Sequence, residues 1–194
     1  MEMILNNMKI NNMETRVLSP GIFEIKNFIS QDEVNEFISI CKTSNEEDWS
    51  VWGEGSTWYG NILMPTPIMD IFKEVDERVS GLFCSYSKIH PLHSIHRVRE
   101  GQDLPYHSDN GSSNERTENI VYGIVLYLNN DFSGGELDYW GLGISYTPRP
   151  GSLVIHLGGL RHGIKEVTNG TRYMITSFIE GDEKNPAILN LEKN

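Results

Sequence analysis

The chain has 194 residues and a mass of 22.1 kDa, enough for one domain with its own hydrophobic core. Hydrophobic residues make up 38% and aromatic residues 10%, which excludes an intrinsically disordered chain. The 27 Asp and Glu outnumber the 16 Lys and Arg, and the net charge of −11 disfavours nonspecific binding of nucleic acid, although a small local basic site remains compatible with it. Two cysteines, Cys41 and Cys84, are too few for a disulfide framework, which favours a reducing, cytoplasmic location.

The sequence carries no sign of membrane insertion. Residues 1–16 lack the apolar segment of a signal peptide. The longest apolar stretch, residues 120–128, contains Gly123 and is far shorter than the roughly 20 residues that span a bilayer. We therefore expect a soluble protein with no membrane partner.

The first half of the chain predicts one short strand and a first helix. Residues 1–17 show no clear periodicity and are interpreted as a loose lead-in, and residues 22–28 have the mixed pattern of a short strand. Ser30 followed by Glu33 is a capping box, which predicts the start of a helix. The apolar face of this helix would consist of Val34, Phe37, Ile38 and Cys41.

A second helix is predicted to start at Thr66 and Pro67, which suit the N-cap and the first turn. Helical spacing then continues through Ile68, Ile71, Phe72, Val75, Val79, Leu82, Phe83 and Tyr86. Between the two helices, residues 49–60 hold Trp49, Trp52 and Trp58 among glycines. We expect these rings to pack on the core, with a lid over a functional site as the alternative.

The second half of the chain predicts short strands separated by Gly, Asn and Pro turns. Helices followed by many strands indicate one α+β domain whose β half is a sandwich or barrel. We expect a single domain over 1–194, with its core at about 18–180 and a peripheral tail at 182–194. The predicted strands are 94–99, 119–128, 136–139, 152–157 and 172–179.

His107 and Asp109 are two residues apart, and both are of types that commonly ligate metal ions. Residues two apart in an extended chain point to the same side, so the two side chains can share a metal ion. His162 is the best candidate for a third ligand, and two histidines with one carboxylate form the facial triad of non-heme Fe(II) oxygenases. A packed histidine beside a surface aspartate is the alternative interpretation of such a pair.

Arg172 opens an apolar strand ten residues beyond His162. A buried guanidinium needs an anion, because an unpaired buried charge is very costly. A carboxylate ligand would satisfy it with two parallel hydrogen bonds, and an internal Asp or Glu is the alternative partner.

These segments resemble the iron(II)- and 2-oxoglutarate-dependent dioxygenases, in their prolyl 4-hydroxylase-like branch. The resemblance covers about residues 18–180. It is carried by Tyr106-His107-Ser108-Asp109, Tyr127-Leu128-Asn129, Ser133-Gly134-Gly135-Glu136-Leu137, Pro150-Gly151-Ser152-Leu153 and the segment from His162 to Arg172.

The resemblance implies a double-stranded β-helix (jelly roll) with N-terminal supporting helices. It also implies that His107, Asp109 and His162 bind iron and form the catalytic centre. Arg172 would hold the distal carboxylate of 2-oxoglutarate, with Tyr127 and Thr176 as further cosubstrate contacts.

The implied cofactors are Fe(II), 2-oxoglutarate and O2, with ascorbate as an additional candidate. In the implied reaction, 2-oxoglutarate is decarboxylated to succinate while a C–H bond is hydroxylated. The implied substrate is a prolyl residue in a peptide or protein, with a free amino acid or another small molecule as the alternative.

Some positions depart from the family pattern. Family members often carry tyrosines where this chain has Val98 and Leu104, and a phenylalanine where it has His156. His156 is compatible with a hydrogen bond to a metal ligand or with ordinary packing.

Three other functions are less favoured. A nucleic-acid demethylase would have a second arginine at Phe178, and a halogenase would lack the carboxylate of Asp109. A catalytically silent jelly-roll binding module would have no need of the complete triad and Arg172. Finally, the polar loop of residues 110–118 is predicted to help cover the substrate, opposite the loop of residues 49–60, with a plain solvent-exposed connection as the alternative.

Overall fold

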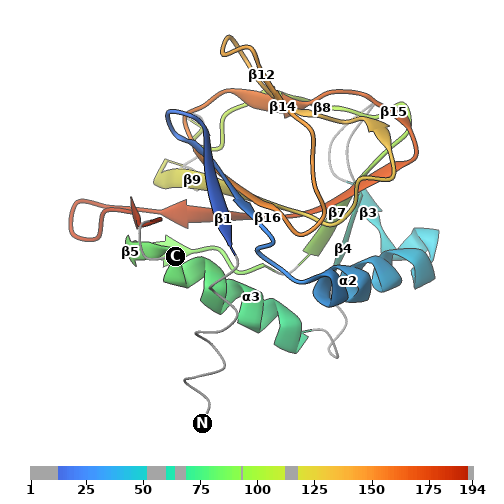
Figure 1. Ribbon diagram of the computed structural model, residues 1–194, viewed down its shortest axis with the longest axis horizontal. Helices are drawn as coiled ribbons and strands as arrows, with labels where there is room; N and C mark the ends of the chain where they lie inside the picture. Colours follow the sequence, from blue (N-terminus) through green and yellow to red (C-terminus); the bar gives the residue numbers. More distant parts are fainter. Residues whose placement is uncertain (1–12, 52–59, 64–68, 93, 112–117, 192–194) are drawn as a thin grey trace.

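The computed structural model describes residues 13–51, 60–63, 69–92, 94–111 and 118–191. Two antiparallel β-sheets face each other, and the helices α2 and α3 cover the outer side of the larger sheet (Figure 1). The larger sheet therefore lies between the helices and the smaller sheet. This arrangement confirms the predicted α+β class, a jelly roll with N-terminal supporting helices.

The larger sheet has the strand order β1-β2-β13-β9-β16-β7-β4-β3, and β6 pairs with the end of β16. Strands distant in sequence are neighbours throughout its centre, as expected for a jelly roll. The strands are β1 (Glu14–Ser19), β2 (Ile22–Lys26), β3 (Ser50–Val51), β4 (Gly60–Leu63), β6 (Lys88–Ile89), β7 (Ser94–Arg99), β9 (Ile120–Tyr127), β13 (Leu153–Leu157) and β16 (Thr171–Glu180).

The smaller sheet has the order β12-β11-β14-β8, and two further strand pairs flank the sheets. Its strands are β8 (Leu104–His107), β11 (Leu137–Tyr139), β12 (Ile144–Tyr146) and β14 (His162–Ile164). The flanking pairs are β10 (Ser133–Gly134) with β15 (Val167–Asn169), and β5 (Phe83–Ser85) with β17 (Ile188–Leu189).

Helix α2 (Gln31–Thr43) begins where the capping box predicts. Glu33 N–H donates to the Ser30 hydroxyl, and the Glu33 carboxylate accepts from Ser30 N–H at 2.7 Å. The same carboxylate forms an ion pair with Arg78 of helix α3 (Met69–Gly81). A local capping signal therefore also connects the two helices that support the larger sheet.

We expect Ser30→Ala to lower the free energy of unfolding by about 1 kcal/mol, because the N-cap hydroxyl is lost. Urea unfolding measures the change. Ser39→Ala is the matched control, since Ser39 is exposed within the same helix and alanine is the better helix former. Equal stabilities of the two variants would contradict a stabilising role for the cap.

Alternation along the central strands divides the apolar side chains between two layers. On β9, Ile124 and Leu126 belong to the core beneath the helices, whereas Val125 and Tyr127 belong to the core between the sheets. The same alternation on β16 confirms that four of its residues share one side, because all of them line the cavity between the sheets: Arg172, Met174, Thr176 and Phe178.

Three expectations from the sequence need correction. The second helix ends at Gly81 rather than continuing to Tyr86, because the next residues form β5 and pair with β17 from the end of the chain. The lead-in predicted for residues 1–17 is in part an edge strand, β1, whose exposed side chains leave no apolar period to detect. The tail of residues 182–194 is not only peripheral, since Leu189 of β17 packs against the core.

Some predicted features lie outside the described residues. These are the helix start at Thr66 and Pro67, the side chains of Trp52 and Trp58, and most of the loop of residues 110–118. Trp49 is described and is buried, with its ring 4.1 Å from the guanidinium carbon of Arg97. For this tryptophan, packing on the core is confirmed.

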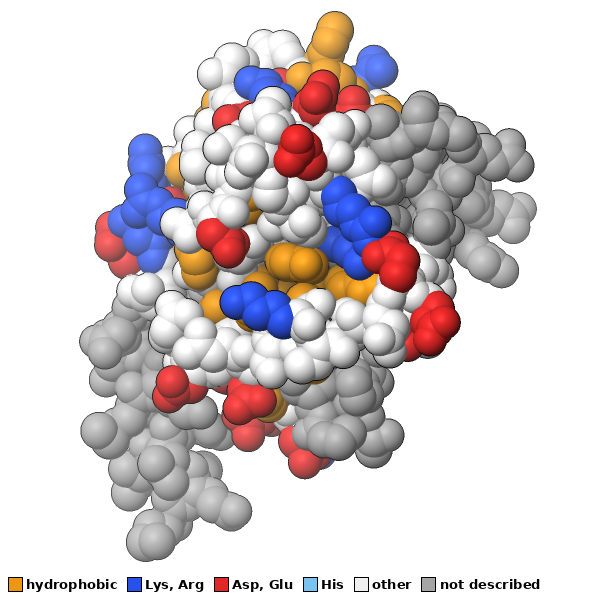
Figure 2. Space-filling view, turned by 90° about the vertical axis from the view of Figure 1, so that its right-hand side faces the viewer, with side chains coloured by type: hydrophobic (Ala, Val, Ile, Leu, Met, Phe, Trp, Pro, Cys, Tyr) orange, Lys and Arg blue, Asp and Glu red, His pale blue; other side chains and the backbone are white. Residues whose placement is uncertain are grey.

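The surface agrees with the acidic composition. On the face shown in Figure 2, Lys and Arg side chains stand in separate small groups rather than forming one continuous basic surface. Within the described ranges, neither helix is long and apolar enough to cross a membrane.

Candidate active site

A cavity of about 500 Å³, open to solvent, lies between the two sheets. Both sheets contribute to its wall, because β8, β11 and β14 face β9, β13 and β16 across it. Most of the lining is apolar, and the polar residues that line it are His107, Asp109, His156, His162, Arg172 and Thr176.

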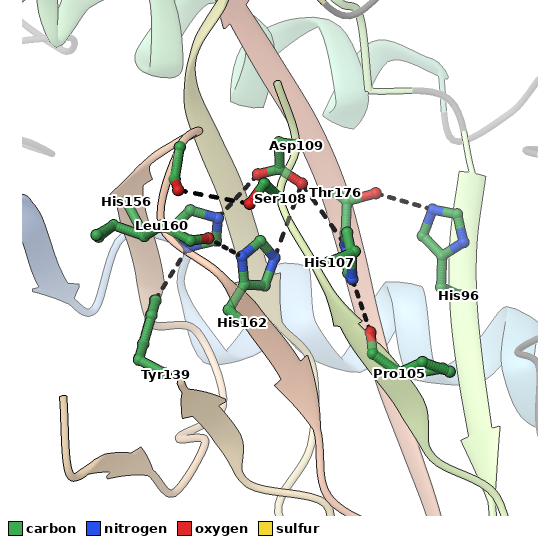
Figure 3. A network of polar contacts seen from close by, with 11 residues as sticks. His96, Pro105, His107, Ser108, Asp109, Tyr139, His156, Leu160, His162 and Thr176 are labelled. Carbon is green, nitrogen blue, oxygen red and sulfur yellow. Dashed lines mark hydrogen bonds and ion pairs between the residues drawn. The ribbon is translucent and has the colours of Figure 1, made fainter. Parts of the chain in front are cut away.

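Three candidate metal ligands meet at this cavity. His107 ends β8 and pairs in register with His162, the first residue of β14, while Asp109 lies two residues beyond His107. The Oδ1 atom of Asp109 is 3.7 Å from Nε2 of each histidine (Figure 3). One ligand atom from each of the three side chains lies within 4.8 Å of the others, so the group can hold one metal ion.

Backbone carbonyls fix the orientation of both imidazoles. Nδ1 of His107 lies 2.9 Å from the Pro105 carbonyl oxygen, and Nδ1 of His162 lies 2.9 Å from that of Leu160. Because a carbonyl oxygen only accepts, each Nδ1 carries the proton and each Nε2 presents its lone pair. Both lone pairs are therefore available on the side of Asp109, as metal ligation requires.

Burial controls the charge of the group. It lowers the pKa of His162 to about 4, so this imidazole is neutral at pH 7. Burial alone would raise the pKa of Asp109, but the hydrogen bond from His156 and the neighbouring His162 and His107 outweigh it, and the pKa lies below its ordinary value. The site thus presents the neutral imidazole of His162 and the carboxylate of Asp109, with the His107 imidazole beside them.

Arg172 is fully buried and lines the same cavity. Among the described residues, none accepts a hydrogen bond from its Nε or Nη2, and Nη1 contacts only the weak acceptor Met174 Sδ at 2.6 Å. An internal Asp or Glu, the alternative partner considered from the sequence, does not pair with it within the described ranges. A carboxylate in the cavity would supply the missing acceptors and the missing charge.

The two other residues expected to contact the cosubstrate differ in position. Thr176 lines the cavity on the same side of β16 as Arg172, and its hydroxyl lies 3.1 Å from Nε2 of His96. Tyr127 is fully buried beside Arg172, whose guanidinium carbon is 5.1 Å from the centre of the Tyr127 ring. Tyr127 supports the arginine and is not part of the cavity lining.

Sequence reasoning missed part of the arrangement around Asp109. The Tyr139 hydroxyl lies at hydrogen-bond distance from His156, and Gly123 lies opposite His156 in the sheet, next to Asp109. Only the pairing of strands that are distant in the sequence brings these residues together. His156 was detectable, because it departs from the family's phenylalanine.

The lowered pKa of His162 predicts a pH-dependent stability of the metal-free protein. In the unfolded chain the imidazole takes up a proton near pH 6.5, whereas in the fold it does so near pH 4. The stabilisation of the folded state by the neutral His162 imidazole is complete above pH 6.5 and is lost as the pH falls toward 4. Denaturant unfolding of the metal-free protein between pH 7.5 and 4.5 should show this loss, and His162→Phe should flatten the profile. Parallel profiles for the two proteins would contradict it.

Comparisons with known proteins show a resemblance to one family. Residues 93–180, which include the whole candidate site, match the model of the 2OG-Fe(II) oxygenase superfamily. A PKHD-type hydroxylase of Prochlorococcus marinus is 21% identical over 186 residues, covering 87% of this chain and 84% of the relative. The resemblance to these oxygenases, in their prolyl 4-hydroxylase-like branch, is thereby confirmed.

Solved structures share the fold. A Pseudomonas putida prolyl-4-hydroxylase is 19% identical with a TM-score of 0.63, covering 84% of this chain and 93% of that one. A prolyl hydroxylase from Trichoplax adhaerens, solved with a hypoxia inducible factor peptide, is 18% identical with a TM-score of 0.65, covering 93% and 90%. The viral collagen prolyl hydroxylase of Paramecium Bursaria Chlorella virus-1, solved with 2OG, is 18% identical with a TM-score of 0.62, covering 84% and 97%.

Proposed function

We propose that this chain, a relative of the 2OG-Fe(II) oxygenases, is an Fe(II)- and 2-oxoglutarate-dependent dioxygenase that hydroxylates a prolyl residue of a peptide or protein. The observation that carries the proposal is the convergence of two imidazoles and one carboxylate beside a cavity whose buried arginine has no carboxylate partner within the described residues. The first group suits Fe(II), and the second suits a dicarboxylate cosubstrate.

Different residues of the chain would bind the metal and the cosubstrate. Nε2 of His107, Nε2 of His162 and Oδ1 of Asp109 would hold Fe(II), which supplies the O2 chemistry that couples decarboxylation of 2-oxoglutarate to C–H hydroxylation. Arg172 would bind the distal carboxylate, held in place by the ring of Tyr127, with the Thr176 hydroxyl in the same cavity. The apolar remainder of the lining offers water few hydrogen-bond partners in this space.

The substrate assignment draws on the opening of the site and on the relatives. The His107 side chain is 41% exposed, so the candidate metal centre is reachable from solvent. The PKHD-type relative is named a hydroxylase, and the Trichoplax enzyme binds a peptide. Phe178, where a demethylase of nucleic-acid bases would have its second arginine, forms part of the apolar wall. These points favour a peptide over a nucleic acid, and a small molecule remains the second candidate.

The test combines a binding and a product measurement. Fe(II) and 2-oxoglutarate, added together without O2, should give a weak visible charge-transfer band. With O2, with and without ascorbate, a panel of proline-containing peptides and free amino acids should show a mass gain of one oxygen that requires 2-oxoglutarate. A gain only on free amino acids would contradict the peptide assignment. No band and no succinate would contradict the oxygenase itself.

A further inference from the structure

A series of hydrogen bonds leads from Tyr139, in the core between the sheets, through His156 to the carboxylate of Asp109. The hydroxyl of Tyr139 lies 3.0 Å from Nδ1 of His156, and Nε2 of His156 lies 2.9 Å from Oδ2 of Asp109 (Figure 3). The three residues are all buried, with His156 only 1% exposed. Of these three residues, only Asp109 belongs to the candidate metal ligands.

For a His156 ring that carries one proton, the donors and acceptors of these hydrogen bonds permit one arrangement. The carboxylate of Asp109 only accepts, so Nε2 of His156 carries the proton and donates it. Nδ1 of the neutral ring is then an acceptor, and the Tyr139 hydroxyl is its donor. Both ring nitrogens of His156 are thereby satisfied, which fixes the ring in one orientation. His156 is protonated on Nε2, whereas His107 and His162 are protonated on Nδ1.

The neighbouring strand leaves space for this contact. Gly123 of β9 pairs with His156 of β13. A Cβ atom at position 123 would lie 2.1 Å from Oδ2 of Asp109 and 2.4 Å from Nε2 of His156. Real Cβ atoms do not approach other atoms so closely, so any other residue at 123 would displace the hydrogen bond between His156 and Asp109. The local geometry thus depends on four residues that are separated in the sequence: Asp109, Gly123, Tyr139 and His156.

The two oxygens of Asp109 have different surroundings. Oδ2 is bound by His156, while Oδ1 faces Nε2 of His107 and His162 at 3.7 Å each. A carboxylate that rotated freely could offer both oxygens to a metal ion and occupy a position that a cosubstrate needs.

We propose that His156 is a positioning residue, which holds Oδ2 of Asp109 and so leaves Oδ1 as the single ligating oxygen. The inference rests on the proposed function, because it assigns Asp109 to the metal. Tyr139 sets the orientation of the His156 ring, and Gly123 provides the space. His156 itself does not ligate the metal, because its Nε2 carries a proton.

The protein without any substitution provides a first test. A two-bond ¹H–¹⁵N spectrum of the metal-free protein distinguishes the tautomers of its histidines. We expect the imidazole of His156 to be protonated at Nε2, with its signals assigned by their absence from His156→Phe or, if that variant does not fold, by through-bond connectivity. A His156 ring protonated on Nδ1 and not on Nε2 would overturn the proposal, since Nε2 could not then donate to Asp109.

The second test measures metal affinity without turnover. Mn(II) binding, followed by electron paramagnetic resonance without 2-oxoglutarate, is compared among His156→Phe, His156→Gln and Tyr139→Phe. The phenylalanine variant keeps a ring but loses the donor, and we expect a loss of affinity of about 10–100-fold. The glutamine variant places an N–H donor at similar reach and should recover most of that loss. Tyr139→Phe should show a smaller loss, because the bond between His156 and Asp109 remains.

His90→Phe is the matched control, since His90 pairs with Glu180 and, within the described residues, contacts none of the three candidate ligands. Its Mn(II) affinity should equal that of the parent. Unchanged affinity in His156→Phe, or equal losses in the phenylalanine and glutamine variants, would overturn the proposal. If the parent binds Mn(II) with the expected pattern but consumes no 2-oxoglutarate, the proposed function fails while the positioning role of His156 stands.

Discussion

His107→Ala abolishes succinate formation from 2-oxoglutarate, because it removes one of the two imidazole ligands. The substitution is the cleanest test of the triad, since the His107 side chain is 41% exposed and contributes little to the core. We expect an unchanged melting temperature of the metal-free protein together with a large loss of Fe(II) affinity. Succinate release and anaerobic Fe(II) binding, measured on the same preparation, give the two results.

Ser108→Ala is the matched control for this prediction. Ser108 lies between the two ligands in sequence, and within the described residues its hydroxyl makes only a long contact of 3.4 Å to the Gly159 carbonyl. This variant should keep both iron binding and turnover. Near-parental turnover in His107→Ala at unchanged iron content would show that the triad is wrongly assigned. His162→Ala should also abolish turnover, but its buried position adds a loss of stability that must be measured separately.

Local signals explain which parts of the fold could be predicted. The capping box at Ser30 and Glu33 and the short β-like run of residues 94–99 involve neighbours in the sequence, and both elements start where expected. The end of the second helix could not be predicted in this way. Residues 83–85 continue the helical spacing, and only their pairing with β17, about 100 residues later, makes them a strand.

Local sequence patterns likewise predict only part of the candidate site. The spacing of His107 and Asp109 lies within one segment, and the anion requirement of a buried Arg172 follows from its chemistry alone. The hydrogen bonds around Asp109 instead depend on two registers, Gly123 opposite His156 and Tyr139 opposite His162. No local pattern encodes these registers, so the sequence identified His156 only as a departure from the family.

Arg172→Met should have opposite effects on cosubstrate binding and on stability. Removing a buried, charged hydrogen-bond donor from a carboxylate costs about 2–5 kcal/mol, which is roughly a 30-fold to several thousandfold weaker binding of 2-oxoglutarate. Without the cosubstrate, the parent buries a guanidinium whose Nε and Nη2 have no acceptor within the described residues. Replacing it with an apolar side chain of similar length should therefore leave the free protein as stable as the parent or more stable.

Thermal melting with and without 2-oxoglutarate measures both effects in the presence of Mn(II). The parent should gain stability as 2-oxoglutarate is added, because the ligand binds the folded state alone, whereas the variant should gain little. Mn(II) affinity is the control and should be equal in both proteins, since no described contact joins Arg172 to the three ligands. Equal stabilisation by 2-oxoglutarate would remove Arg172 from the cosubstrate site. A large loss of stability in the free variant would instead mean that the guanidinium already has a partner in the fold, and the argument from its unpaired atoms would fail.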